Sequence, residues 1–141
     1  MRLPEILYSY RPVPLPESGE WNLSEQVKQI HFDLNPDDTP GEYRTGYIHL
    51  DSYIPCAPES IEGCMAELDR AAGAHPWMVF FQLLTIHPFN NGNRRVASKL
   101  LGIDVLAYQT EHAEQYLAAL HQARFEGEFG DWMEICGKAV L

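Results

Sequence analysis

The spacing of apolar residues along the chain predicts a mainly α-helical protein. In four stretches apolar side chains recur every three or four residues, which places them on one face of a helix. These stretches are 22–34, 58–72, 111–124 and 132–141. Two further stretches, 76–86 and 96–106, are apolar runs that also indicate helices, the second of them bent or ended by Gly102. We expect 76–86, which is apolar nearly all round, to be the central buried helix.

Two segments do not fit the helical pattern. Residues 42–55 form the one strand-like region, because they are rich in β-branched and aromatic side chains. Residues 1–21 contain four prolines among three aromatic residues, and closely spaced prolines prevent a regular helix. We therefore expect an extended N-terminal arm over 1–21 and a single domain over 22–141.

Composition narrows the classes of partner. The chain has 141 residues, of which 45% are hydrophobic, and a formal net charge of −10. An acidic chain is poorly suited to nucleic acid or to an anionic membrane surface. Its three cysteines lack zinc-site spacing, and no apolar stretch reaches the length of a signal core or a membrane span. These features predict a cytoplasmic protein with neither nucleic-acid nor membrane partners.

The chemistry is concentrated in the polar segment 87–95, which lies between the two apolar runs. It contains Gly92 and two adjacent cations, Arg94 and Arg95. The helix that follows would direct its unpaired N–H groups toward the same space, an arrangement suited to phosphate. His87 is placed to exchange a proton beside that phosphate. The structural alternative is a simple turn in which Asn93 caps a helix, the arginines pair with surface carboxylates and His87 ends a helix.

The segment resembles the motif of the Fic/Doc family: His, any residue, Phe, any residue, Asp or Glu, Gly or Ala, Asn, Gly or Lys, Arg. Five residues match at the family's spacing: His87, Phe89, Gly92, Asn93 and Arg95. Two depart from it, because Asn91 replaces the carboxylate and Arg94 replaces the Gly or Lys. The resemblance implies a Fic-like helical bundle with the motif loop at 87–95 and a short β-hairpin flap at about 42–55.

The segment Gly41-Glu42-Tyr43-Arg44-Thr45 is similar to the one that leads into the family's flap. The resemblance implies that the flap, here Arg44, Thr45, Gly46 and Tyr47, holds an extended segment of a target protein by strand addition. The structural alternative is an ordinary hairpin packed over the core. Phe89 is expected to insert into the core and to fix the motif loop in place.

The family's activity is the transfer of AMP, or of another phosphate-containing group, from a nucleotide to a Ser, Thr or Tyr hydroxyl of a target protein. By position His87 would be the general base, and Asn93 with Gly92 would hold the α-phosphate. Arg95 would bind the β- or γ-phosphate, and Arg94 either adds a phosphate contact or crowds the site. The resemblance thus implies ATP as donor and catalysis by His87, Asn93 and Arg95.

Asn91 stands where the family places a Mg²⁺ ligand. An amide oxygen contributes no charge, so Mg²⁺ should bind weakly here, although phosphoryl transfer depends heavily on that metal. Three outcomes stay open: reduced activity with ATP, a different donor or metal arrangement, or a protein that binds nucleotide without turnover. The alternative function is therefore a degenerate Fic fold acting as a nucleotide- or protein-binding module. A metal-dependent hydrolase is disfavoured, since no His-Glu-x-x-His spacing occurs.

Many family members carry an inhibitory helix of the pattern Ser/Thr-x-x-x-Glu-Gly/Asn, which limits their own activity. The two Glu-Gly pairs here, at 62–63 and 126–127, have Pro58 and Gln122 four residues before the glutamate. Neither pair fits the pattern. We expect restraint to come from a small antitoxin-like partner or from the change at Asn91. The family context implies a bacterial cytoplasmic protein or one delivered into a host cell.

Overall fold

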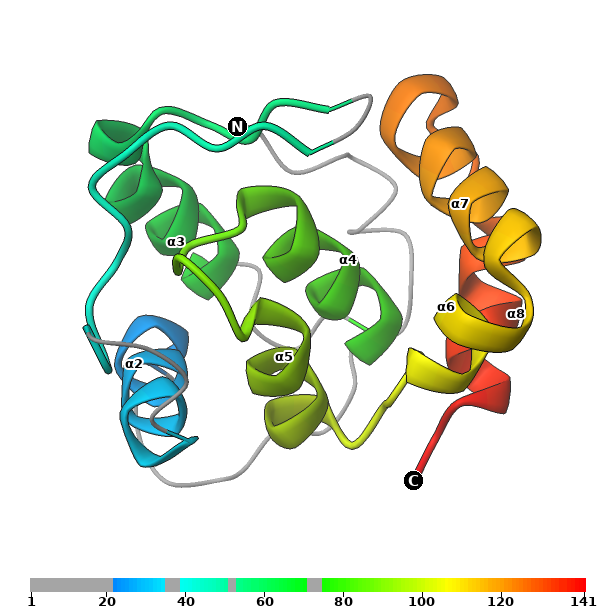
Figure 1. Ribbon diagram of the computed structural model, residues 1–141, viewed down its shortest axis with the longest axis horizontal. Coiled ribbons are helices and arrows are strands. Elements are labelled where there is room, and N and C mark those ends of the chain that lie inside the picture. The colour runs from blue at the N-terminus through cyan, green and yellow to red at the C-terminus, as the bar shows by residue number, and fades with distance from the viewer. Residues whose placement is uncertain (1–21, 35–38, 51–52, 71–74) are drawn as a thin grey trace.

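The computed structural model describes residues 22–34, 39–50, 53–70 and 75–141, so the predicted arm 1–21 lies outside the described residues. The described part is helical, which confirms the predicted fold class (Figure 1). A 3-10 turn, Pro58–Ser60, precedes α3, and a π-helical turn, Gln122–Glu126, follows α7. The α-helices are α2 (Leu23–Leu34), α3 (Ile61–Arg70), α4 (Pro76–Ile86), α5 (Asn93–Leu101), α6 (Leu106–Glu111), α7 (Ala113–His121) and α8 (Gly130–Lys138).

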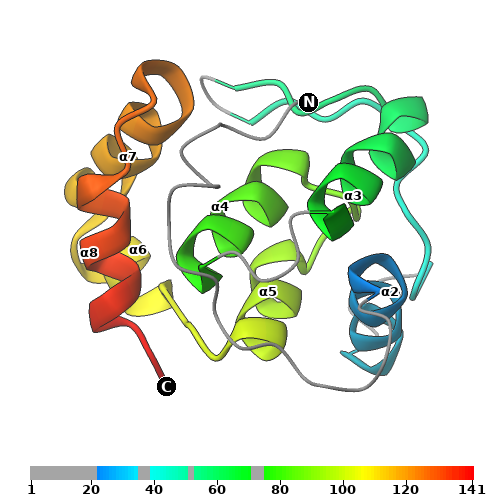
Figure 2. The same ribbon diagram turned by 180° about the vertical axis from the view of Figure 1, so that it is seen from behind.

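Helix α4 is the centre of the fold, as the apolar run predicted. Every residue from Trp77 to Ile86 is buried. Helices α3 and α5 pack on α4 from one side and α8 from the other (Figures 1 and 2). Pro76 at the first helical position suits the start of α4, because its missing N–H would have had no intrahelical partner. A helix enclosed in this way gives His87, the residue after its end, a rigid support.

Aromatic packing joins α8 to this centre. The indole of Trp132 is fully buried, and its Nε1 donates to the backbone oxygen of Trp77 at 2.8 Å. Its ring meets Phe80 and Tyr116 with centroids 6.0 and 5.8 Å apart. Buried indoles generally need a hydrogen-bond acceptor as well as apolar neighbours, and Trp132 has both. The C-terminal helices are thereby fixed against the helix that carries the motif.

Two predicted helix boundaries are wrong. The helix after the motif was expected to begin at 96, but α5 begins at Asn93, so the last three motif residues are helical rather than part of a loop. Gly92 takes the position before the helix with φ 74°, a conformation that favours glycine, and Gly102 ends α5 with φ 69°. The helix expected over 111–124 corresponds to α7, which begins at Ala113, and to the π-helical turn that continues it, while a separate short helix, α6, ends at Glu111.

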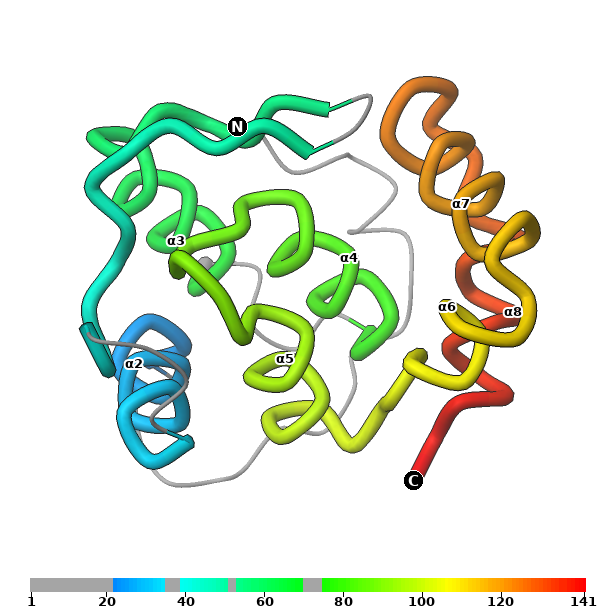
Figure 3. The backbone as a smooth tube through the Cα atoms, in the orientation of Figure 1, coloured from blue at the N-terminus to red at the C-terminus, as the bar shows by residue number. Residues whose placement is uncertain are grey.

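The predicted β-hairpin flap over 42–55 is also wrong. The described residues of this segment run extended and double back (Figure 3), but they hold only one antiparallel bridge, between Leu50 and Tyr53, and no strand. The backbone N–H of Arg44 donates instead to the carbonyl of Pro88 in the motif segment, at 2.8 Å. β-forming side chains fit a pleated surface rather than dictate one, and here tertiary contacts replace the ladder.

The C-terminus is tied to the connection between α5 and α6. Ile103 and Val140 form an antiparallel bridge, and the N–H of Leu141 donates to the carbonyl of Gly102 at 2.9 Å. This contact fixes α8 against the connection that follows the motif helix. Within the described ranges no helix has the length and apolar character needed to cross a bilayer.

Candidate functional site

A cavity of about 420 Å³ lies where the end of α4 meets the start of α5, α7 and the π-helical turn. It is therefore assembled from segments that are far apart in the sequence. The junction predicted to hold phosphate is open rather than filled by side chains. The residues that line it are Leu50, Leu84, His87, Asn91, Gly92, Asn93, Arg94, Arg95, Gln109, Tyr116, Leu117, Leu120 and Arg124.

His87 closes helix α4 and lines the cavity. Its backbone takes the left-handed conformation, with φ 52°, and its N–H donates to the carbonyl of Leu83 at 2.9 Å. A non-glycine residue seldom adopts this conformation, and such residues often occur at functional sites. Among the described residues His87 is the only non-glycine residue with positive φ.

The imidazole of His87 is neutral at cellular pH. Burial, together with the nearby guanidinium groups of Arg44 and Arg124, lowers its pKa to about 4, against a hydrogen bond to the backbone of Leu84 that raises it. A neutral ring has a free nitrogen that can accept a proton. The position thus meets the protonation requirement for the general base that the motif predicted.

Arg44 holds the end of α4, and this corrects its predicted placement at a target-facing flap. Its side chain is only 2% exposed. Nε donates to the carbonyl of His87 at 2.6 Å, and Nη2 to that of Ile86 at 3.2 Å. The remaining donors reach the carbonyls of Gly46 at 2.9 Å and Cys56 at 2.6 Å. A cation at this point satisfies the carbonyls that a helix end leaves free and complements the helix dipole.

Asn93 closes the motif loop from within. Its Oδ1 accepts from the backbone N–H of Phe89, and its Nδ2 donates to the carbonyl of the same residue, both at 2.9 Å. The side chain is 5% exposed, so its role in the structure is to shape the loop. The predicted capping role is not what this amide performs, and only one of its N–H groups is left for a phosphate.

Phe89 inserts into the core, which confirms its predicted structural role. It is fully buried, and its ring stacks on His31 with centroids 3.9 Å apart and planes 6° apart. Nδ1 of His31 accepts from the N–H of Gly41 at 2.8 Å. The ring therefore carries its proton on Nε2, which lies 3.3 Å from the carbonyl oxygen of Asn91 and donates to it. Helix α2 in this way fixes two residues of the motif loop.

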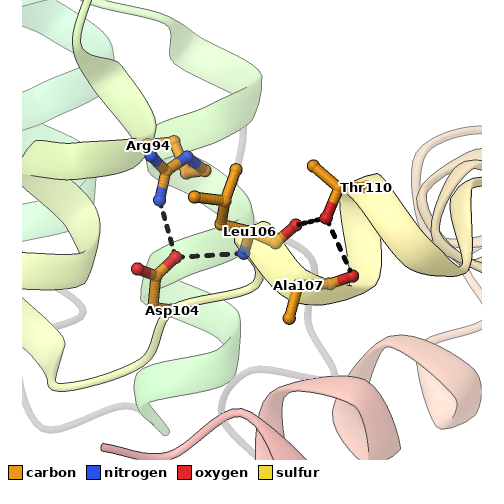
Figure 4. Close-up of polar contacts among 5 residues, drawn as sticks. All are labelled: Arg94, Asp104, Leu106, Ala107 and Thr110. Atoms are coloured by element: carbon orange, nitrogen blue, oxygen red, sulfur yellow. Dashed lines mark hydrogen bonds and ion pairs between the residues drawn. The ribbon is translucent and has the colours of Figure 1, made fainter.

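The two adjacent arginines have different surroundings. Nη1 of Arg94 lies 2.6 Å from Oδ1 of Asp104, which also accepts from the N–H of Leu106 at 3.0 Å (Figure 4). Arg94 thus pairs with a carboxylate, as the structural alternative predicted. The side chain of Arg95 is exposed and makes no hydrogen bond or ion pair within the described part of the chain. The first intrahelical N–H of α5 is that of Val96, so the backbone N–H groups of the three preceding residues are available to an anion.

The cavity does not offer the ligands that Mg²⁺ prefers. Asn91 is exposed and presents an amide, and no Asp or Glu lines the cavity. No cluster of three or more His, Cys, Asp or Glu suited to a metal occurs among the described residues. Mg²⁺ is normally bound through at least one carboxylate together with the substrate's phosphates. The donor set here is cationic and amide-rich, so it does not fit the ion.

Arg124 also lines the cavity, although no sequence pattern predicted it there. It lies in the π-helical turn, and its Nε donates to Oγ1 of Thr85 at 3.3 Å. Its guanidinium also lies over the ring of Tyr53, 4.5 Å from the centroid. A single arginine on an expected surface helix carries no signal of function. Only the folding of α7 and the π-helical turn against α4 reveals it.

Three of the residues predicted to dock a target, Thr45, Gly46 and Tyr47, are exposed. Tyr47 is 71% exposed, and its hydroxyl group lies 3.3 Å from Oε1 of Glu59. Leu50, a little further along, reaches the cavity itself. The segment therefore runs from an exposed surface toward His87.

A solved structure shares the fold, and a curated protein is similar in sequence. The structure of BepC, a VirB-translocated effector of Bartonella tribocorum with bound AMPPNP, covers 96% of this chain and 80% of its own with a TM-score of 0.63 at 14% identity. The protein adenylyltransferase fic-1 of Caenorhabditis briggsae is 27% identical over 124 residues, which is 72% of this chain and 23% of that protein. The chain thus spans about a quarter of the length of that relative.

The family profile described as Fic/DOC matches residues 21–103. This range contains the motif, α4 and all of α5, as well as the segment that Arg44 anchors. Because the match covers more than half of the chain, the family is shown independently of the motif's two departures. The chain belongs to the Fic/DOC family.

Proposed function

We propose that this chain transfers AMP, or another phosphate-containing group, from ATP to a Ser, Thr or Tyr hydroxyl of a target protein. One observation carries the proposal: the neutral imidazole of His87 lines the same cavity as the start of α5 and Arg95. Such a transfer requires a proton acceptor and an anion site in the same cavity. The name of the related adenylyltransferase supports the same reaction.

In the proposed reaction the hydroxyl oxygen of the target attacks the α-phosphorus of ATP. A new phosphorus–oxygen bond forms, the bond between the α-phosphorus and the bridging oxygen to the β-phosphorus breaks, and pyrophosphate leaves. His87 takes the hydroxyl proton and later releases it to solvent. The free N–H groups at the start of α5 and the guanidinium of Arg95 bind the phosphate oxygens and stabilise their charge.

The target would present its hydroxyl along the exposed segment that contains Thr45, Gly46 and Tyr47. Between the Arg44–Pro88 hydrogen bond and the Leu50–Tyr53 bridge this segment is extended and has no strand partner within the described ranges. Unpaired extended backbone can accept an added strand whatever the sequence of that strand. An antitoxin-like inhibitor is proposed as a separate partner, since neither Glu-Gly pair fits the family's inhibitory helix.

Labelled nucleotide distinguishes the reactions. The chain is incubated with cell lysate and with ATP labelled at either the α- or the γ-phosphate. Label on protein from the α position alone indicates AMP transfer, and label from the γ position alone indicates phosphate transfer. His87→Ala should lower the rate by about two to four orders of magnitude. If neither the α- nor the γ-label appears on protein, the proposed transfer is overturned.

A binding module is the second candidate, and two specific observations favour it. Arg94 pairs with Asp104, and the amide of Asn93 is engaged with Phe89. Both groups thus use some of their donors and acceptors within the fold, which leaves fewer for a phosphate. In that case ATP binds without turnover, so binding is measurable by calorimetry while both labels stay off protein.

A further inference from the structure

The charge of the cavity differs from that expected of a metal-assisted site. Three arginines line it, and no carboxylate does. Arg94 already has Asp104 as a partner. Arg95 and Arg124 remain to neutralise an anionic ligand, and Arg124 does not belong to the family motif.

Arg124 is held in a fixed orientation and keeps donors in reserve. Nε is engaged by Thr85, and the flat face of the guanidinium lies over Tyr53. The hydroxyl of Tyr53 in turn donates to the carbonyl of Thr85 at 3.1 Å, so the last turn of α4 fixes both. Nη1 and Nη2 make no hydrogen bond within the described part of the chain. A planar fork of this kind matches two phosphate oxygens at once.

The surroundings of Arg124 provide no anionic partner for its charge in the described part of the chain. The side chain is only partly exposed, and burial lowers the pKa of the guanidinium. No carboxylate forms an ion pair with it in the described ranges. A partly buried cation of this kind is unfavourable alone and is stabilised when an anion enters. A π-helical turn, which is uncommon and often occurs at functional sites, places it there.

We propose that Arg124 binds the polyphosphate of the nucleotide and, with Arg95, supplies the positive charge that a divalent cation would otherwise provide, so that nucleotide binding here does not require Mg²⁺. The inference rests on the proposed function, because it concerns the same cavity and the same donor. It goes beyond that function by assigning a phosphate-binding residue outside the motif and by making the site independent of metal.

The test is calorimetric titration of the full chain with AMPPNP, in excess EDTA and again in Mg²⁺. The dissociation constants in the two buffers should agree within about threefold. Arg124→Gln should weaken binding in EDTA by at least about tenfold, the loss expected for a charge-assisted hydrogen bond to phosphate. Arg124→Lys keeps the charge but loses the planar pair of donors, so its affinity should lie between those of the wild type and Arg124→Gln.

Lys99→Gln is the matched control, since Lys99 is an exposed cation of α5 outside the cavity lining. It removes the same charge and should leave the dissociation constant within about twofold. If Arg124→Gln fails to fold, Thr85→Val decides, because it removes the acceptor for Nε and leaves the charge. Thr85→Val should weaken binding in EDTA, but by less than the about tenfold expected when the charge of Arg124 is removed.

The outcomes separate this inference from the function on which it rests. Binding that disappears in EDTA and returns with Mg²⁺, or an Arg124→Gln protein that binds as the wild type does, overturns the inference and leaves the transfer reaction standing. A chain that binds AMPPNP in neither buffer overturns both. Equal affinity in both buffers, lost with Arg124, supports the assignment even if no transfer is detected.

Discussion

The guanidinium Nε of Arg44 lies 2.6 Å from the carbonyl oxygen of His87, across 43 residues of sequence. This contact joins the extended segment after α2 to the residue proposed as general base. It replaces the β-ladder that the segment's composition suggested, and it explains why His87 is held in a left-handed conformation at the end of α4.

Replacing Arg44 by Met should destabilise the fold. The change removes a buried cation that serves four carbonyl oxygens, and buried acceptors left without partners cost about 1–3 kcal/mol each. We expect a loss of about 3–5 kcal/mol in the free energy of unfolding, measured by urea denaturation. Arg95→Met, at an exposed position, is the control and should change stability by less than about 0.5 kcal/mol. Equal losses for both variants would contradict the anchoring role of Arg44.

Replacing Asn93 by Ala should also act first through stability. Both polar ends of this amide are used by the backbone of Phe89 in a buried site. Removing them leaves an N–H and a carbonyl group unpaired, at a cost of about 2–4 kcal/mol. Thermal denaturation measures the change, and Asn91→Ala, at an exposed side chain, is the control. An Asn93→Ala protein of normal stability would mean that the amide serves only the ligand.

Stability should fall between about pH 6.5 and pH 4 through His87. Its pKa is lowered to about 4 in the folded protein from a reference value of 6.5, mainly by burial. In this window the unfolded chain binds a proton that the folded chain does not, so acid favours unfolding; above the reference value there is no penalty. His87→Gln should remove this part of the dependence. The urea midpoints of the wild type and of His87→Gln, measured between about pH 4 and pH 6.5, test this. The same dependence on pH in both proteins would contradict the contribution of His87.

The same shift predicts the pH profile of transfer. Because the free protein keeps His87 neutral down to about pH 4, the acid limb of kcat/KM should lie near that value rather than near 6.5. A bound polyphosphate adds negative charge near the ring and stabilises the imidazolium form, so the acid limb of kcat should lie at higher pH. Rates at varied ATP concentration separate the two limbs. Coincident limbs would argue against phosphate binding beside His87.

Replacing Asn91 by Asp should introduce a response to Mg²⁺. A carboxylate at this position gives the cavity an anionic oxygen, which Mg²⁺ prefers to an amide. We expect Mg²⁺ to tighten AMPPNP binding to the variant by about tenfold or more, and to raise transfer. In EDTA the new charge should instead weaken binding, since it competes with the phosphates for the arginines. Asn90→Asp, at the exposed position beside it, is the control, and no gain from Mg²⁺ in Asn91→Asp would contradict the view of Asn91 as a lost ligand.

Replacing Asp104 by Asn should free Arg94 for the ligand. The amide oxygen can still accept from the N–H of Leu106, so the start of α6 is retained while the ion pair is lost. Binding of AMPPNP should tighten by about fivefold, which corresponds to about 1 kcal/mol. Calorimetry in EDTA measures it. Unchanged affinity would show that Arg94 serves only the fold.

The candidate site was predictable where its residues are neighbours in sequence. The motif alone indicated the segment 87–95 and the helix before it, and Phe89 was correctly expected in the core. The position of Arg44 was misjudged because composition cannot say whether a side chain faces a target or the end of a helix. Two of its carbonyl partners, those of the helix end, are 42 and 43 residues away, which no local pattern records.

The sequence by itself determined the helical class, the buried α4 and the place of the motif, because the spacing of apolar residues and the glycine at 92 act over a few residues each. The tertiary structure alone decided which cations share the cavity. Arg94 pairs with Asp104, ten residues away in the sequence, whereas Arg124 bonds to Thr85, 39 residues away. The packing of whole helices sets the distances between residues that are far apart in the sequence. The energy of that packing comes from contacts throughout the core, so no single segment of the sequence determines it.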